Sequence, residues 1–159
     1  MAHLPPLPES ARGGLNEGLL AFLRGRARRG TPSQWDVDDY ELHTHPDLIE
    51  RLTEAAGWTR AEMCAAYGCP VLVHPNGVVF ALALGMRALF FRLPPELRGG
   101  LRQAEVDPGI GVDWVAVEAW PADLTGAEGT RRVKQWCWRA YEHAGSLAHD
   151  GGTRAAPRG

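Results

Sequence analysis

The stretch VLVHPNGVVFALALGMRALFFRLP (residues 71–94) decides the fold class. Its runs of Val, Leu, Ala and Phe are separated by two groups of turn residues, His-Pro-Asn-Gly at 74–77 and the segment 85–87. Proline presets its own φ, and Asn76 and Gly77 tolerate the positive φ that tight hairpin turns require. The stretch therefore predicts three consecutive antiparallel strands.

The flanking sequence predicts helices and a further strand. Within 15–29, Leu15, Leu19, Phe22 and Leu23 recur at helical spacing, and a second helix should begin at Pro46. A Thr and a Glu three residues apart predict a capping box at 59–62 and another at 125–128, each opening a helix. Segment 96–104 is a short-helix candidate, and 113–119 is predicted as a fourth strand.

These elements predict one α+β domain: an antiparallel meander of about four strands with helices packed on one face. We expect residues 1–46 to be an N-terminal extension with one amphipathic helix and an acidic loop. Residues 47–148 would form the α+β domain, and residues 149–159 a disordered tail.

The composition limits which classes of function are plausible. The chain has 159 residues, is 45% hydrophobic and 23% charged, and has a formal net charge of −2, which argues against a general polyanion binder. No apolar run approaches the roughly 18 residues of a membrane helix, and the first residues do not resemble a secretion signal. We therefore expect a cytoplasmic protein that does not insert into membranes.

Alternation along the strands predicts two unlike sheet faces. Bulky residues such as Phe80, Leu82 and Leu84 are expected under the helices, with Ala81 and Ala83 on the opposite face. That second face would also carry Phe90, Arg92, Trp114, Glu118 and His74.

Three interpretations of this second face stay open. The N-terminal segment could fold over it, or a second copy or another protein could bind it. Alternatively, Arg92 and Glu118 could be the polar anchors of a small-ligand pocket.

Two tryptophans are further candidate anchors of a contact. Trp138 lies two positions after the core residue Trp136, so it points away from the buried stripe of its helix. Trp35 lies in the acidic loop. Tryptophan often dominates the energy of a protein contact.

A family resemblance covers about residues 47–144. MCAAYG (63–68), FALAL (80–84), ALFFRL (88–93) and WPADLTGAEGTRRVKQWCWRAYEHA (120–144) resemble, in this order, segments of the TfoX N-terminal domain. The resemblance implies an α+β domain of the kind found in competence and regulatory proteins, with no established catalytic role.

Segment 52–68 also resembles a helix-turn-helix. Its second helix would offer Arg60 as the only cation for DNA, although DNA binding depends on neutralising phosphates. Nucleic acid is therefore an unlikely partner.

Metal and catalytic motifs are weak. His43, His45, Cys64, Cys69 and His74 carry zinc-binding atoms, but Cys-x4-Cys without a second matched pair is a poor zinc signature. There is no Gly-x-Ser-x-Gly motif and no glycine-rich phosphate loop, and a Cys69–His74 thiol–imidazole pair follows no known pattern. We assign no catalytic residue, metal or cofactor.

The sequence thus favours a non-catalytic binding or regulatory domain that meets a protein partner, or a second copy, through the open sheet face. One alternative is a small-ligand-binding protein or small enzyme with a pocket at Phe90, Arg92, Trp114 and Glu118. The other is a helix-turn-helix DNA-binding protein.

Overall fold

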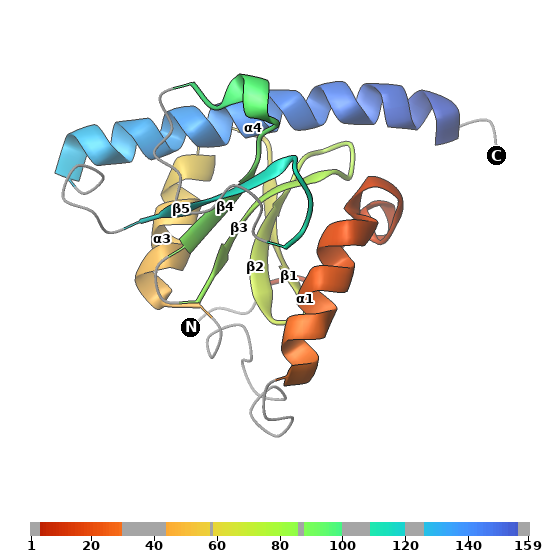
Figure 1. The fold of residues 1–159 in the computed structure, drawn as a ribbon, viewed down its shortest axis with the longest axis horizontal. Helices are drawn as coiled ribbons and strands as arrows, with labels where there is room; N and C mark the ends of the chain where they lie inside the picture. Colours follow the sequence, from red (N-terminus) through yellow and green to blue (C-terminus); the bar gives the residue numbers. More distant parts are fainter. Residues whose placement is uncertain are drawn as a thin grey trace.

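A computed structural model describes residues 4–29, 44–57, 59–85, 88–99, 109–119 and 126–155. They form an antiparallel sheet with helices on both sides (Figure 1). The strands neighbour one another in chain order: β1 (Glu62–Ala66), β2 (Cys69–Val73), β3 (Val79–Leu84), β4 (Ala88–Arg92) and β5 (Trp114–Glu118). The predicted α+β meander is confirmed, with one strand more than expected.

Three α-helices and several short 3-10 turns are described. The turns η1 (Glu9–Ala11) and η2 (Gly14–Asn16) lead into α1 (Glu17–Arg29). The other helices are α3 (Pro46–Ala56) and α4 (Gly126–Ala155). At the start of α3, Pro46 occupies the first turn and the His45 Nδ1 accepts a hydrogen bond from the Asp47 N–H at 3.0 Å. None of the described helices is both long and apolar enough to span a membrane.

The extra strand replaces a predicted helix. Thr59 does not open a helix: its hydroxyl donates to the Ala56 carbonyl at 2.8 Å and accepts from the Ala61 N–H at 3.1 Å, which makes a turn after α3. The residues that follow form β1, which pairs with β2 and buries Cys64 and Ala66. The prediction of a second helix in the expected helix-turn-helix is therefore wrong, because these residues pair with β2 instead.

Two other helix predictions are modified. Of the predicted helix at 96–104, the described part contains only the single turn η4 (Pro95–Leu97). The final helix is confirmed, and it continues through residues 149–155, where the tail was expected to begin.

Each face of the sheet carries its own apolar core. The α3 and α4 side holds Leu89, Phe91, Leu93, Val115 and Val117, as predicted. On β3, however, Ala81 and Ala83 face these helices, and Leu82 and Leu84 lie on the opposite side. The predicted orientation of these four side chains is wrong.

The β3–β4 turn explains the inversion. Leu84 pairs with Ala88, so three residues form the loop, and Leu82 lies directly opposite Phe90. Residues paired across two strands point to the same face of the sheet. A loop one residue longer or shorter would therefore place every side chain of β4 on the opposite face relative to β3. Phe80 differs from its even-numbered neighbours because the β2–β3 register shifts beside it, which directs its ring to Tyr141 of α4 at 5.5 Å.

The second face is covered by the N-terminal segment, the first of the three interpretations. Figure 1 shows α1 on the side of the sheet opposite α3. Phe90, Trp114 and Leu82 share one core with side chains from the segment, namely Leu7, Ala11, Leu19 and Leu23. The face is therefore not open in this structure.

The described N-terminal residues 4–29, which we call the cover, are joined to the sheet by one buried side chain. Asn16 is 2% exposed, and its Nδ2 donates to the Ala11 carbonyl at 2.9 Å and to the Gly77 carbonyl at 2.8 Å. Its Oδ1 accepts from the Val79 N–H at 2.9 Å. The amide thus satisfies backbone groups of both the N-terminal segment and the β2–β3 hairpin.

We predict that Asn16→Ala lowers the free energy of unfolding by about 3 kcal/mol, at roughly 1 kcal/mol for each of three hydrogen bonds. Urea denaturation measures this change. Gln135→Ala, which removes an exposed amide from α4, should change stability by less than about 0.5 kcal/mol. Equal effects of the two substitutions would contradict the role given to Asn16.

A second contact holds the same cover in place. Gly77 has a φ of +99°, and a Cβ there would lie 2.8 Å from the Ser10 carbonyl oxygen. Gly85 has a φ of +76° with no atom near a Cβ. We expect Gly85→Ala to cost about 1 kcal/mol through backbone strain alone, and Gly77→Ala roughly 1–2 kcal/mol more. If the Val79 N–H exchanges faster in Gly77→Ala but not in Gly85→Ala, the Ser10 contact is the cause of the larger stability loss.

Candidate functional site

The residues predicted for the sheet pocket are only partly brought together. Arg92 and Trp114 are direct cross-strand partners, and Phe90 lies on the same face. Glu118 pairs with Ala88 at the far end of β5. The four side chains therefore do not form one pocket, and Trp35 lies outside the described residues.

Arg92 ties the cover to the sheet. Its guanidinium carbon lies 5.2 Å from the centre of the Trp114 ring, and its Nη2 donates to the Leu15 carbonyl at 2.6 Å. The side chain is 7% exposed. Burial lowers the pKa of Arg92 to about 10, against the opposing effect of the Asp113 carboxylate. The residue expected to anchor a ligand is thus engaged by the protein itself.

Two other predicted residues, His74 and Trp138, belong to one aromatic row with Tyr141. The ring centre of Tyr141 on α4 lies 4.6 Å from that of His74 and 5.4 Å from that of Trp138. The Asn76 N–H donates to the His74 Nδ1 at 3.1 Å. Burial lowers the pKa of His74, although its hydrogen bond with Asn76 opposes the shift.

Trp138 borders a hollow of about 600 Å³ beside α4. The described residues that line the hollow are Arg131, Lys134, Gln135, Trp138 and Arg139. The Trp138 side chain is 41% exposed. The Arg139 Nη1 donates to the Gly99 carbonyl at 2.7 Å, and Arg131 pairs with Glu128 at 2.8 Å on the exposed surface. We call this surface the α4 face.

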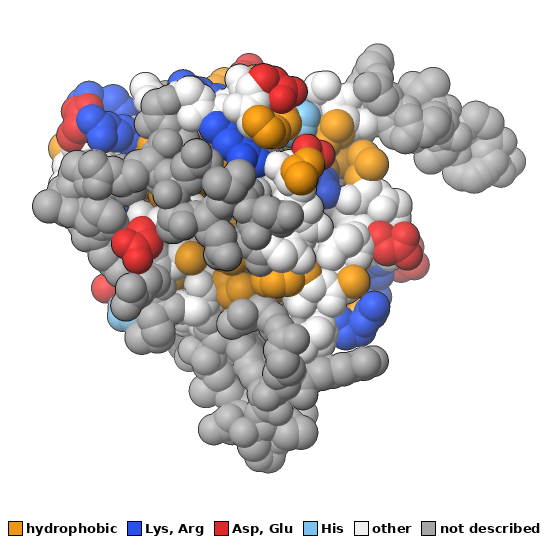
Figure 2. Space-filling view, viewed as in Figure 1, with side chains coloured by type: hydrophobic (Ala, Val, Ile, Leu, Met, Phe, Trp, Pro, Cys, Tyr) orange, Lys and Arg blue, Asp and Glu red, His pale blue; other side chains and the backbone are white. Residues whose placement is uncertain are grey.

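Sequence reasoning missed a second hollow, of about 380 Å³, which we call the hairpin groove. It lies between the N-terminal segment, α1 and the turn that joins β1 to β2. Figure 2 shows basic side chains with apolar and acidic ones beside them along the edge of the molecule where α1 lies. The residues of the groove used below are Leu7, Arg12, Glu17, Leu20, Arg24 and Tyr67.

Tyr67 has an unfavourable backbone conformation. Its φ is +51° and that of Gly68 is +78°, the left-handed pair of a two-residue hairpin turn that favours Asn-Gly. A tyrosine there costs roughly 1–2 kcal/mol. Its side chain is 45% exposed. Tyr-Gly in place of Asn-Gly was the signal in the sequence that could have revealed this position.

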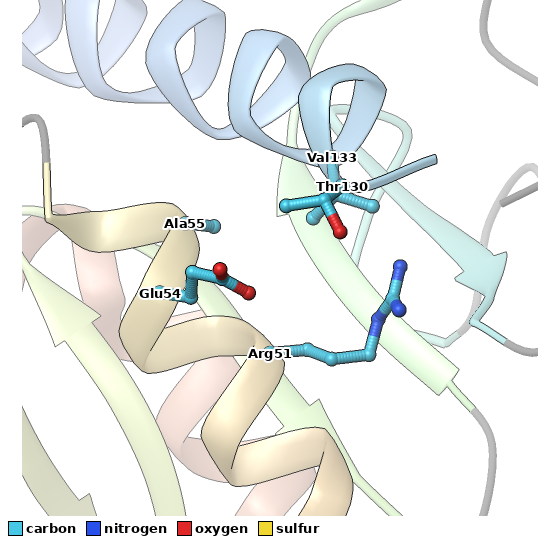
Figure 3. A pocket seen from close by; sticks show the side chains of 5 residues that line it. All are labelled: Arg51, Glu54, Ala55, Thr130 and Val133. Atoms are coloured by element: carbon cyan, nitrogen blue, oxygen red, sulfur yellow. The ribbon is translucent and has the colours of Figure 1, made fainter. Parts of the chain in front are cut away.

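A third cavity, between α3 and α4, is too small for a ligand. Figure 3 shows Arg51 extending from α3 toward the first turns of α4, below Thr130 and Val133. The cavity has a volume of about 10 Å³, room for about one water molecule.

The described cysteines are held as thiols. Burial raises the pKa of Cys64 to about 11 and that of Cys137 to about 12. The Cys69 Sγ donates to the Ala83 carbonyl at 3.0 Å, and Cys69 lies at the opposite end of β2 from His74. Because the thiolate is the nucleophilic form, Cys64 and Cys137 are poor nucleophiles near neutral pH. Among the described residues, no three His, Cys, Asp or Glu side chains gather as metal ligands would.

We predict that His74 weakens the fold in mild acid. Its pKa in the folded chain lies below the ordinary value of 6.5, so below that pH the unfolded chain binds more protons. The free energy of unfolding should therefore fall as the pH drops from about 7.5 to about 5.5, and His74→Gln should reduce the fall. Urea denaturation at both pH values measures it. An NMR titration that places the pKa of His74 at or above 6.5 would contradict the prediction.

Comparison with known proteins adds no relative to this description. No protein family, curated protein or solved structure matches the chain.

Proposed function

We propose that this chain is a non-catalytic, cytoplasmic protein-binding domain, and that the α4 face around Trp138 is its contact surface. The observation that carries the proposal is an exposed tryptophan held between cations on a long helix. Tryptophan and arginine are the residues that most often dominate the energy of a protein contact.

Trp138 is held in place before any partner arrives. Its ring packs on Tyr141, and Tyr141 packs in turn on His74 and Phe80. Gly145 supports this arrangement, since a Cβ at that position would lie 3.0 Å from the His74 Nε2. A side chain that is already ordered loses little entropy on binding, so the aromatic row favours Trp138 as an anchor.

The charges beside Trp138 favour an acidic partner. Arg131, Lys134 and Arg139 line the hollow, and no carboxylate is among its described lining residues, although Glu128 beside it pairs with Arg131 at 2.8 Å. The Arg139 Nη1 donates to the Leu97 and Gly99 carbonyls, and no carboxylate of the described residues pairs with it. Complementary charge of this kind accelerates encounter and selects against basic partners.

The same charges argue against a symmetric dimer through this face. A two-fold contact would place Arg131, Lys134 and Arg139 of one copy against the same residues of the other. Repulsion between them would oppose the association. We therefore favour a different protein with acidic residues and an apolar anchor, and treat self-association as an outcome of the test.

The resemblance of residues 47–144 to the TfoX N-terminal domain, and the regulatory role that it implies, stay predictions. The DNA-binding alternative loses its main support, because β1 stands where the second helix was expected. The small-ligand alternative loses the sheet pocket, because Arg92 and Trp114 are buried under the N-terminal segment.

The test uses the 15N-labelled chain and two matched peptides, one rich in Asp and Glu with Leu and Phe anchors, the other with Lys at every acidic position. We expect the acidic peptide alone to shift amide signals of residues 131–139, and added salt to weaken the shift. Trp138→Ala should reduce affinity at least about tenfold. Val112→Ala removes another exposed apolar side chain, 67% exposed, and should leave affinity unchanged.

Two results would contradict the proposal. One is equal binding of both peptides. The other is a mass in sedimentation that rises with protein concentration and returns to that of a monomer in Trp138→Ala, because this result would assign the α4 face to self-association.

A further inference from the structure

We propose that the hairpin groove binds a small molecule that combines a flat apolar body with an anionic group. The inference is independent of the proposed function, because the groove and the α4 face share no residue. It rests on the shape of the groove, on its charges and on the conformation of Tyr67.

The groove has the size and construction of a ligand site. Three segments that are distant in sequence converge on it: the N-terminal segment, α1 and the β1–β2 hairpin. Its volume of about 380 Å³ lies within the range of small-molecule pockets, about 300–1,000 Å³. Leu7 and Leu20 supply apolar surface, and both belong to the cover that packs on the sheet. The walls are thus built on ordered elements.

The charges of the groove select an anion. Among the described residues that line the groove, Arg12 and Arg24 supply two guanidinium groups and Glu17 one carboxylate. The Arg12 Nε donates to the Leu7 carbonyl at 3.0 Å, which holds that guanidinium at the wall. Glu17, Leu20 and Arg24 are spaced at three and then four residues along α1, so they line one side of the helix. An apolar body over Leu20 would place its anionic group near the arginines.

Tyr67 is the second, independent observation. Asparagine would fit its left-handed backbone with less strain, and the tyrosine is 45% exposed. Within the described part of the chain, neither the Tyr67 side chain nor the Arg24 side chain has a hydrogen-bond or ion-pair partner. The fold therefore gains little from the tyrosine that would offset its strain. The tyrosine ring lies at the rim of the groove, where a flat ligand can stack on it. This stacking would account for a tyrosine at a strained position.

The experiment uses three probes with one aromatic body: 2-naphthoate, 2-naphthyl phosphate and 2-naphthylmethylamine. Each is titrated into the full-length 15N-labelled chain. We expect the carboxylate, the phosphate or both to shift the amide signals of residues 12–24 and 65–68, and the ammonium probe to leave them unchanged. The stronger of the two anions would show which anionic group the groove prefers.

The decisive variant is Tyr67→Asn. It should unfold at a higher urea concentration than the original chain, because asparagine suits the turn, and yet bind the anions at least about tenfold more weakly. Weaker binding by a variant that is more stable than the original chain could not be attributed to unfolding. Arg24→Gln should also weaken binding about tenfold, whereas Trp138→Ala on the α4 face should have no effect.

Three results would overturn the inference: binding of the ammonium probe as tightly as the anions, unchanged affinity in Tyr67→Asn, or no shift of these amides by either anion up to about 10 mM. Trp138 belongs to the α4 face and not to the groove. A negative result with the naphthyl probes would therefore not contradict the function proposed for the α4 face. A negative result with the acidic peptide would likewise not contradict the ligand site proposed for the groove.

Discussion

The structure depends on the fact that the five-stranded sheet is apolar on both faces. Helices α3 and α4 cover one face, and the residues before and within α1 cover the other. The second cover is short, and the Asn16 amide holds it by hydrogen bonds to backbone groups on both sides of the junction. Buried backbone groups must find partners, so this amide fixes where the cover sits, together with the Arg92 hydrogen bond to the Leu15 carbonyl and the Gly77–Ser10 contact.

Closing the second face changes the role of the residues on it. Arg92 stacks on Trp114 and donates to the Leu15 carbonyl, so it acts as a structural tie between sheet and cover. The two surfaces that we propose for binding lie on the segments that cover the sheet. One is the outer face of α4 around Trp138, and the other is the groove between the N-terminal segment and Tyr67.

The errors of the sequence-based prediction share a cause. Tyr67 and Gly68 form a hairpin turn without the usual Asn-Gly signature. The residues before this turn were therefore predicted as a helix rather than as β1. The β3–β4 turn was placed correctly at 85–87, but the faces of β3 and β4 were assigned from side-chain bulk and not from pairing across that turn, so Leu82 was placed under α3 and α4. Trp138 was predicted correctly as exposed, because a position two residues from a core residue on a helix faces away.

By itself the sequence determined the strands from β2 to β5, the start of α3, the final helix and the exposure of Trp138. These features depend on turn residues, caps and periodicity within one segment. Only the tertiary structure decided which side chains of β3 share a face with those of β4, and that the N-terminal segment closes the sheet. The reason is that strand register and long-range packing depend on residues far apart in the chain, such as Asn16 and Gly77, which no local pattern connects.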